Sequence, residues 1–387
     1  MAQLSKESLS RTGGMGPFWI AALLLVLTEA VLHLGPVRHG VEALSEGLWL
    51  DREVTRRASA IMPLHQDLAE RPMNEAYLRG LARTEAGTRI VVVGDSIVWQ
   101  TPDHVAFHQE LGRVLASDFP GSDVQVYALC MPGMNCAAAF YLLKAMLAEF
   151  RPDLVIYVAN PALSGQELSD AVPRYTAFMD RPFFSDDEAR AYARVIKDSQ
   201  SEVGWQRHFS FTTVHDLLNI RYGGALRHIM LPPAVFSGLS SRCYLVECQD
   251  TNNIYWKDLG KKRKKRDTKA IRNMQRFVLS EQGINYTYLL LLPGLMAAND
   301  VPFIAIIPPK NRELIEELGA PWEETVKAGQ AYVADLEKRG VPVIDCTSAV
   351  PEIHFRDTQH LRTEGLKMWV QYIRAPLEQE MKERVLK

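Results

Sequence analysis

Five short apolar segments, most of them rich in Val and Ile, constrain the fold of this chain more than any other feature. Gly, Pro or Asp bounds most of them, which is typical of strands buried on both faces of a parallel sheet. Helical patterns separate the first three segments, at 103–117 and 134–149, and a long amphipathic helix is expected after residue 361. This alternation predicts an α/β fold, with a parallel sheet covered by helices on both faces. The predicted strands cover residues 89–93, 124–129, 154–159, 302–307 and 341–345.

The region from about 161 to 300 interrupts the alternation and is too long for a plain crossover between strands. Helical patterns occur in it near 186–199, 211–230 and 268–298. We interpret the region as a helical insertion that lies over the carboxyl edge of the sheet and shapes a substrate site there.

Two strongly apolar segments lie within this region, at 229–239 and 289–298. Both are too short to span a membrane. Core packing is the simpler interpretation, and a surface that faces a bilayer or a membrane partner is the alternative. Residues 311–339 are expected to form two helices, because Gly319 and Pro321 break the pattern and Pro321 suits the first turn of a helix.

The amino-terminal region contains about 20 mostly apolar residues, at 16–37, which is close to the length that spans a bilayer. A cleavable signal peptide is the alternative, but no convincing small-residue cleavage site follows. Lys6 and Arg11 precede the segment and Arg38 follows it, which leans mildly toward a cytoplasmic amino end. We therefore expect an uncleaved transmembrane helix and an extracytoplasmic body, periplasmic or at the cell surface.

These patterns divide the chain into an amino-terminal tail and anchor at 1–37, a helical connector at 38–85 and an α/β domain at 86–387. The net charge of −2 gives no general reason to expect nucleic acid as a partner. A basic run at 261–266 is interpreted as a solvated loop, with contact to anionic lipid headgroups or an anionic polymer as the alternative.

The five cysteines contain no CxxC pair, so the sequence favours neither a zinc site nor any other cofactor. Cys130 with Cys136, or Cys243 with Cys248, could form short disulfides, but buried thiols are the preferred interpretation.

His104 and His108 are one helical turn apart, but the Glu that a zinc-protease motif requires after the first His is absent. We expect no metal there.

The chemistry of the chain is indicated by a serine directly after the first predicted strand, in Gly94-Asp95-Ser96. This position is at the carboxyl end of the strand, where open α/β sheets keep their ligand sites. Asp357 and His360 follow the last strand at a spacing of three residues. The sequence therefore predicts Ser96 as nucleophile, His360 as its base and Asp357 as the acid that orients the imidazole.

Acyl transfer also needs hydrogen-bond donors for the oxyanion of the tetrahedral intermediate. The backbone N–H of Ser96 is one candidate. Gly133, after the second strand, is expected to offer another backbone N–H, and Asn160, after the third, its side-chain amide. Three successive strand ends thus supply one candidate donor each.

This set of residues, in this order, resembles the SGNH (GDSL-type) hydrolase superfamily. The resemblance covers about 85–160 and 301–387 and implies a flavodoxin-like three-layer α/β/α fold. It also implies the catalytic roles of Ser96, His360 and Asp357 and oxyanion roles for Gly133 and Asn160. One departure is that Pro161 follows Asn160, where the family usually has Asp.

The predicted anchor resembles the architecture of membrane-anchored polysaccharide O-acetylation proteins and teichoic acid D-alanylation proteins. The resemblance implies O-acyl transfer, with acetyl as the expected group, onto a cell-surface glycan or polymer, beside a membrane-bound O-acyltransferase partner and membrane lipid. Hydrolysis of such esters is the first alternative. A non-catalytic scaffold that binds a polymer or an integral-membrane partner is the second.

Overall fold

The computed structural model describes a five-stranded sheet in which all neighbouring strands are parallel and the order is β2-β1-β3-β4-β5. This is the flavodoxin-like strand order. The predicted α/β class is confirmed, and each predicted strand lies within two residues of an observed one. The strands are β1 (Thr88–Gly94), β2 (Val124–Cys130), β3 (Leu154–Val158), β4 (Phe303–Ile307) and β5 (Val343–Asp345). The residues described are 15–41, 78, 80–82, 87–98, 105–130, 134, 136–161, 255–258, 268 and 284–385.

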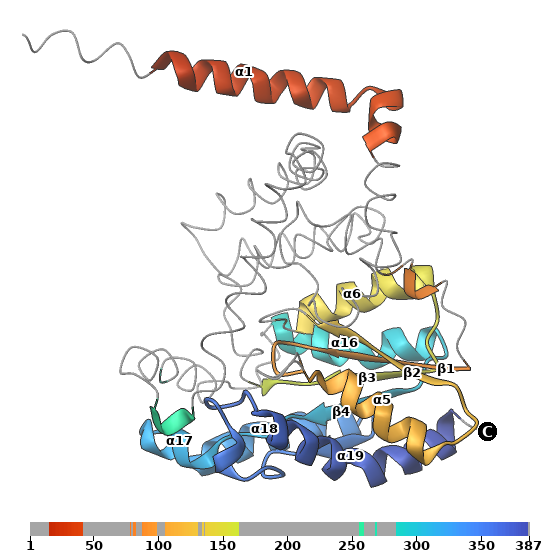
Figure 1. The fold of residues 1–387 in the computed structure, drawn as a ribbon, viewed down its shortest axis with the longest axis vertical. Helices are drawn as coiled ribbons and strands as arrows, with labels where there is room; N and C mark the ends of the chain where they lie inside the picture. Colours follow the sequence, from red (N-terminus) through yellow and green to blue (C-terminus); the bar gives the residue numbers. More distant parts are fainter. Residues whose placement is uncertain are drawn as a thin grey trace, which may run out of the picture.

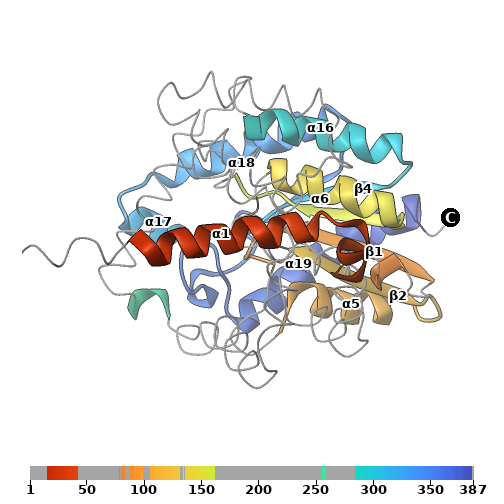
Figure 2. The same ribbon diagram turned by 90° about the horizontal axis from the view of Figure 1, so that it is seen from above.

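Helices cover both faces of the sheet (Figure 1). One face carries α6 (Cys136–Glu149), α16 (Ile284–Ala298) and α18 (Trp322–Glu337). The other face carries α5 (Phe107–Asp118) and α19 (Thr363–Arg384). Figure 1 shows α16 between α6 and α18, and it contacts both helices. Seen from above, α5 and α19 lie on the side opposite to α16 (Figure 2).

Alternate residues of each strand enter two separate hydrophobic cores. Val91 and Val93 of β1 pack toward α6 and α16, whereas Ile90 and Val92 pack toward α5 and α19. All four side chains are fully buried. Because both faces need apolar residues, the strand sequence is an unbroken apolar run rather than a polar–apolar alternation.

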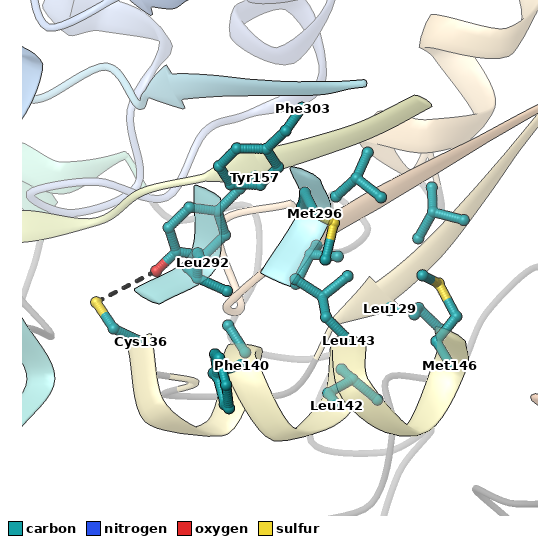
Figure 3. Close-up of a cluster of buried hydrophobic side chains, with 14 of the residues drawn as sticks. Leu129, Cys136, Phe140, Leu142, Leu143, Met146, Tyr157, Leu292, Met296 and Phe303 are labelled. Atoms are coloured by element: carbon teal, nitrogen blue, oxygen red, sulfur yellow. Dashed lines mark hydrogen bonds between the residues drawn. The ribbon is translucent and has the colours of Figure 1, made fainter. Parts of the chain in front are cut away.

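The α16 helix belongs to the first core. Leu292 and Met296 of this helix lie against Leu143 and Met146 of α6 in the cluster shown in Figure 3. Within segment 289–298 this confirms core packing for Leu289, Leu292 and Met296, while Leu291 is 47% exposed. The crossover from β3 to β4 therefore contains a helix that forms part of the α/β/α layering.

Most of the predicted insertion lies outside the described residues, as do segment 229–239 and the basic run at 261–266. Within it, Trp256 is buried in the second core, and its indole N–H donates to the carbonyl of Glu352 at 3.0 Å. This bond attaches residues 255–258 to the loop that precedes α19.

The predicted break in 311–339 is confirmed. The short helix α17 (Arg312–Glu317) ends before Gly319, whose φ of +76° is a left-handed conformation that glycine adopts readily. Pro321 then caps the amino end of α18.

The amino-terminal helix α1 (Met15–Leu32) exposes large apolar side chains, among them Trp19, Leu23 and Val26. In the part of the chain that the structure describes, no helix combines the length and the apolar character needed to cross a membrane. Residues 42–77 of the predicted connector lie outside that part.

Candidate active site

The turn after β1 presents Ser96 at the carboxyl edge of the sheet. The Asp95 carboxylate shapes this turn, because its Oδ1 accepts the backbone N–H of Ile97 at 2.9 Å. Gly94 allows the close packing beneath it: a Cβ at this position would lie 2.9 Å from Val98 Cγ2 and 3.2 Å from Val158 Cβ. The glycine of the Gly-Asp-Ser sequence is therefore required by sterics.

A second turn, after β5 and before α19, carries Asp357 and His360. Asp357 Oδ1 accepts the backbone N–H groups of Gln359 at 3.0 Å and His360 at 2.8 Å. Its Oδ2 lies 2.8 Å from His360 Nδ1. One carboxylate thus both closes the turn and orients the imidazole that the turn carries.

The structure brings these two turns together. Ser96 Oγ lies 2.9 Å from His360 Nε2, although the residues are 264 positions apart in the sequence. Because the Asp357 carboxylate accepts a hydrogen bond from the Nδ1–H of His360, Nε2 is left as the acceptor for the serine hydroxyl. The side chain of His360 is 21% exposed, so the site can be reached from solvent.

Asp357 is buried, with 4% of its surface exposed. Burial by itself opposes ionisation, but the charge of His360, together with hydrogen bonds from His360 and Gln359, holds the pKa of this carboxyl well below its usual value. Asp357 is therefore ionised over the whole neutral range and available to stabilise an imidazolium.

Asn160 lies just beyond the end of β3, the strand that pairs with β1 in the sheet. Its Nδ2 donates to Asp95 Oδ2 at 2.7 Å and to Gln359 Oε1 at 3.2 Å. These bonds join the serine turn to the histidine turn. They cross the position between β1 and β3 where the strand order reverses, which is where open α/β sheets bind ligands.

The structure adds Lys310, which the sequence analysis did not predict as part of the site. Its ammonium lies 2.8 Å from Asn160 Oδ1 and 2.9 Å from Gln359 Oε1, and the residue is only 4% exposed. Burial lowers the pKa of Lys310 to about 8, although the charges of Asp95 and Asp357 act in the opposite direction. The ammonium is thus mostly protonated at pH 7.

Asn311 is the second residue that the sequence analysis did not predict. Its side chain caps α17 by accepting the N–H of Leu314 at 3.1 Å and donates to the carbonyl of Asp357 at 3.2 Å. Its backbone N–H donates to the carbonyl of Thr358. Asn311 therefore holds the histidine turn against the end of β4.

A signal for both residues was present in the sequence. Lys310 and Asn311 follow a buried strand after two prolines, at the same edge of the sheet as Ser96 and Asn160. Polar residues at that edge are candidates for a site in any parallel α/β sheet. The sequence could not indicate that the lysine side chain folds inward rather than toward solvent.

Three further predictions from the sequence concern Gly133, the His104–His108 pair and the cysteines. Gly133 and His104 are outside the described residues, so no backbone donor is placed there. Among the described residues, no group of three or more His, Cys, Asp or Glu side chains could hold a metal ion. Cys130 and Cys136 are both buried and are not joined to each other, and burial raises the pKa of the Cys130 thiol to about 12.

Comparison with known proteins gives similarity of structure but not of sequence. No family model matches this chain, and no curated protein sequence does. A lipase/acylhydrolase from Enterococcus faecalis aligns with a TM-score of 0.36 and 14% identity, over 77% of this chain and 97% of its own. A carbohydrate acetylesterase family member from Sinorhizobium meliloti aligns with a TM-score of 0.33 and 12% identity, over 76% and 99% of the two chains. At these scores, function has to be inferred from the site itself.

Proposed function

We propose that this chain is a serine-dependent enzyme of the SGNH type that transfers or hydrolyses an O-linked acyl group. The observation that supports this is the continuous contact from Ser96 Oγ through the His360 imidazole to the buried carboxylate of Asp357. These three groups are the nucleophile, the base and the orienting acid of acyl transfer through a serine.

In the proposed reaction, Ser96 Oγ attacks the carbonyl carbon of an ester while His360 Nε2 takes the hydroxyl proton. The tetrahedral intermediate collapses, the bond to the leaving alcohol breaks, and the imidazolium returns the proton to that alcohol. Water or a second alcohol then attacks the acyl-enzyme while His360 takes its proton. The bond between the acyl carbon and Ser96 Oγ breaks, the imidazolium returns the proton to Oγ, and an acid or a new ester is released. Asp357 stays ionised throughout and stabilises the imidazolium.

The developing oxyanion requires donors beside Ser96. We assign this role to the backbone N–H of Ser96, the side-chain amide of Asn160 and the backbone N–H of Gly133. The bond from Asn160 to Asp95, the neighbour of Ser96, supports the second assignment because the amide lies beside the serine turn. Its two N–H groups are donated to Asp95 and Gln359 in this structure, so one of them would have to exchange its partner for the oxyanion.

At a finer level, we propose acetyl transfer onto a cell-surface glycan, with the apolar helix α1 attaching the enzyme to the membrane beside an integral O-acyltransferase. The exposed apolar side chains of α1 and the architectural resemblance support this proposal. Hydrolysis of the same esters is the second candidate, and the 21% exposure of His360 favours it because water can reach the base.

The experiment that tests the enzymatic proposal is labelling of the full chain with a fluorophosphonate probe, combined with turnover of p-nitrophenyl acetate. We expect one covalent adduct on Ser96 and turnover by the natural protein. Ser96→Ala is expected to lose both while it keeps its thermal midpoint. A folded natural protein with neither labelling nor turnover would support the non-catalytic scaffold instead.

A further inference from the structure

The buried lysine at the end of β4 is the strongest feature that the proposed reaction does not use. Two features restrict its backbone. Pro309 precedes it, and the backbone N–H of Lys310 donates to the carbonyl of Thr347 at 3.0 Å. Burying an ammonium is costly unless it is paired, and this one has two carbonyl oxygens as partners. If this position only filled space in the core, an apolar side chain would be expected there, so the buried charge indicates a specific role for the lysine.

The contact with Asn160 supplies one. An ammonium has only donors, so the atom of the Asn160 amide that faces Lys310 has to be the oxygen. The nitrogen of the same amide is then directed at the Asp95 carboxylate, on the side of the serine turn. A cation on the amide oxygen also polarises the N–H bonds and makes them stronger donors.

We propose that Lys310 is a positioning residue for the oxyanion site, where its ammonium fixes the orientation of the Asn160 amide so that one N–H points to Asp95 in the Ser96 turn. Gln359 completes the arrangement, since its Oε1 accepts from both Lys310 and Asn160. The inference rests on the proposed serine mechanism. It predicts that Lys310 affects the chemical step only through Asn160.

The test is a double-mutant cycle on the full chain, with kcat and KM measured for p-nitrophenyl acetate in Lys310→Met, Asn160→Ala and the double variant. Loss of one oxyanion donor lowers kcat by about 10²–10³-fold, and we expect this range for Asn160→Ala. For Lys310→Met we expect kcat to fall by roughly 10–100-fold, with KM and thermal midpoint little changed. The double variant should be no slower than Asn160→Ala alone.

Lys338→Met is the matched control, because this lysine side chain is 76% exposed on the carboxyl end of α18, and kcat should be unchanged. If Lys310→Met does not fold, Lys310→Gln keeps an N–H donor without the charge and enters the same cycle with the same expected pattern.

Two results would overturn the positioning role of Lys310 without overturning the serine mechanism. The first is turnover by Lys310→Met at the natural rate. The second is that Lys310→Met lowers kcat by the same factor in the natural protein and in Asn160→Ala. In both cases labelling of Ser96 in the natural protein would leave the serine mechanism standing. Absence of turnover and labelling in the natural protein would overturn both.

Discussion

At the scale of single residues, the site depends on carboxylates that each serve two purposes. Asp357 closes a turn through two backbone N–H groups and also accepts from the imidazole of His360. Asp95 likewise shapes the serine turn with one oxygen and holds Asn160 with the other. Local turn geometry and site geometry therefore depend on the same two side chains.

Asp357→Asn tests the orienting role. The amide cannot stabilise the imidazolium in the same way, and its N–H₂ group can reverse the tautomer of His360. We expect kcat for p-nitrophenyl acetate to fall by roughly 10³–10⁴-fold, while the backbone turn is largely kept. Stopped-flow or steady-state kinetics measure this, and a loss below ten-fold would contradict the assigned role.

Lys310 gives a prediction about pH. Its pKa is lowered from 10.5 to about 8 in the folded state, so between these values the unfolded chain binds more protons at this group than the folded chain. The free energy of unfolding should therefore rise with pH across this interval, by at most about 3 kcal/mol. Urea unfolding at pH 7.5 and 10 of the natural protein and of Lys310→Met measures this contribution as the difference between their two pH dependences, because other groups, such as the buried Cys130 thiol, titrate in both proteins.

At the scale of elements, the helices form two layers that cover opposite faces of one sheet. The α6–α16 pair covers one core, and the α5–α19 pair covers the other, where Arg374 and Asp118 also form an ion pair. The carboxyl ends of β1, β3 and β4 then place Ser96, Asn160 and Lys310 at one edge. The helices thus contribute to the site indirectly, by burying both faces of the sheet whose edge carries these residues.

Two neighbouring leucines on α16 test whether this helix is a layer of the fold. Leu292 is fully buried against α6, and Leu291 is 47% exposed. We expect Leu292→Ala to lower the free energy of unfolding by about 2–5 kcal/mol. For Leu291→Ala we expect a change within about 0.5 kcal/mol. Denaturant unfolding measures both, and equal effects would mean that α16 does not pack as described.

At the scale of the whole molecule, every described group of the site lies between residues 88 and 360, and α1 contributes none of them. Attachment and catalysis should therefore be separable. Deletion of residues 1–37 is expected to move the protein from the membrane fraction to the soluble fraction. Its turnover of p-nitrophenyl acetate should stay within about two-fold of that of the full chain, because α1 contributes no group to the site. A truncated protein that stays with the membranes would contradict attachment through α1.

The direction of insertion is a separate prediction. We expect a reporter fused at residue 200 to lie outside the cytoplasm, since Lys6 and Arg11 favour a cytoplasmic amino end. A fusion that is active only in the cytoplasm would contradict the proposed localisation.

Much of this architecture could be predicted from the sequence, because its signals are local. Burial on both faces requires unbroken apolar strands, so all five strands and the break between α17 and α18 were predictable. The Asp357–His360 turn is equally local, because its two members are only three positions apart in the sequence. Lys310 and Asn311 were missed because their inward orientation depends on partners that lie far away in the sequence.

The chain by itself determined the order of strands and helices and the residue types at each strand end, since these follow from short-range periodicity and turn chemistry. Only the tertiary structure decided which strands are neighbours, and hence that Ser96 meets His360 across 264 positions and that a buried ammonium meets Asn160. The reason is physical: pairing of strands buries both faces of the sheet at once, and no single segment contains the information about which partner achieves this.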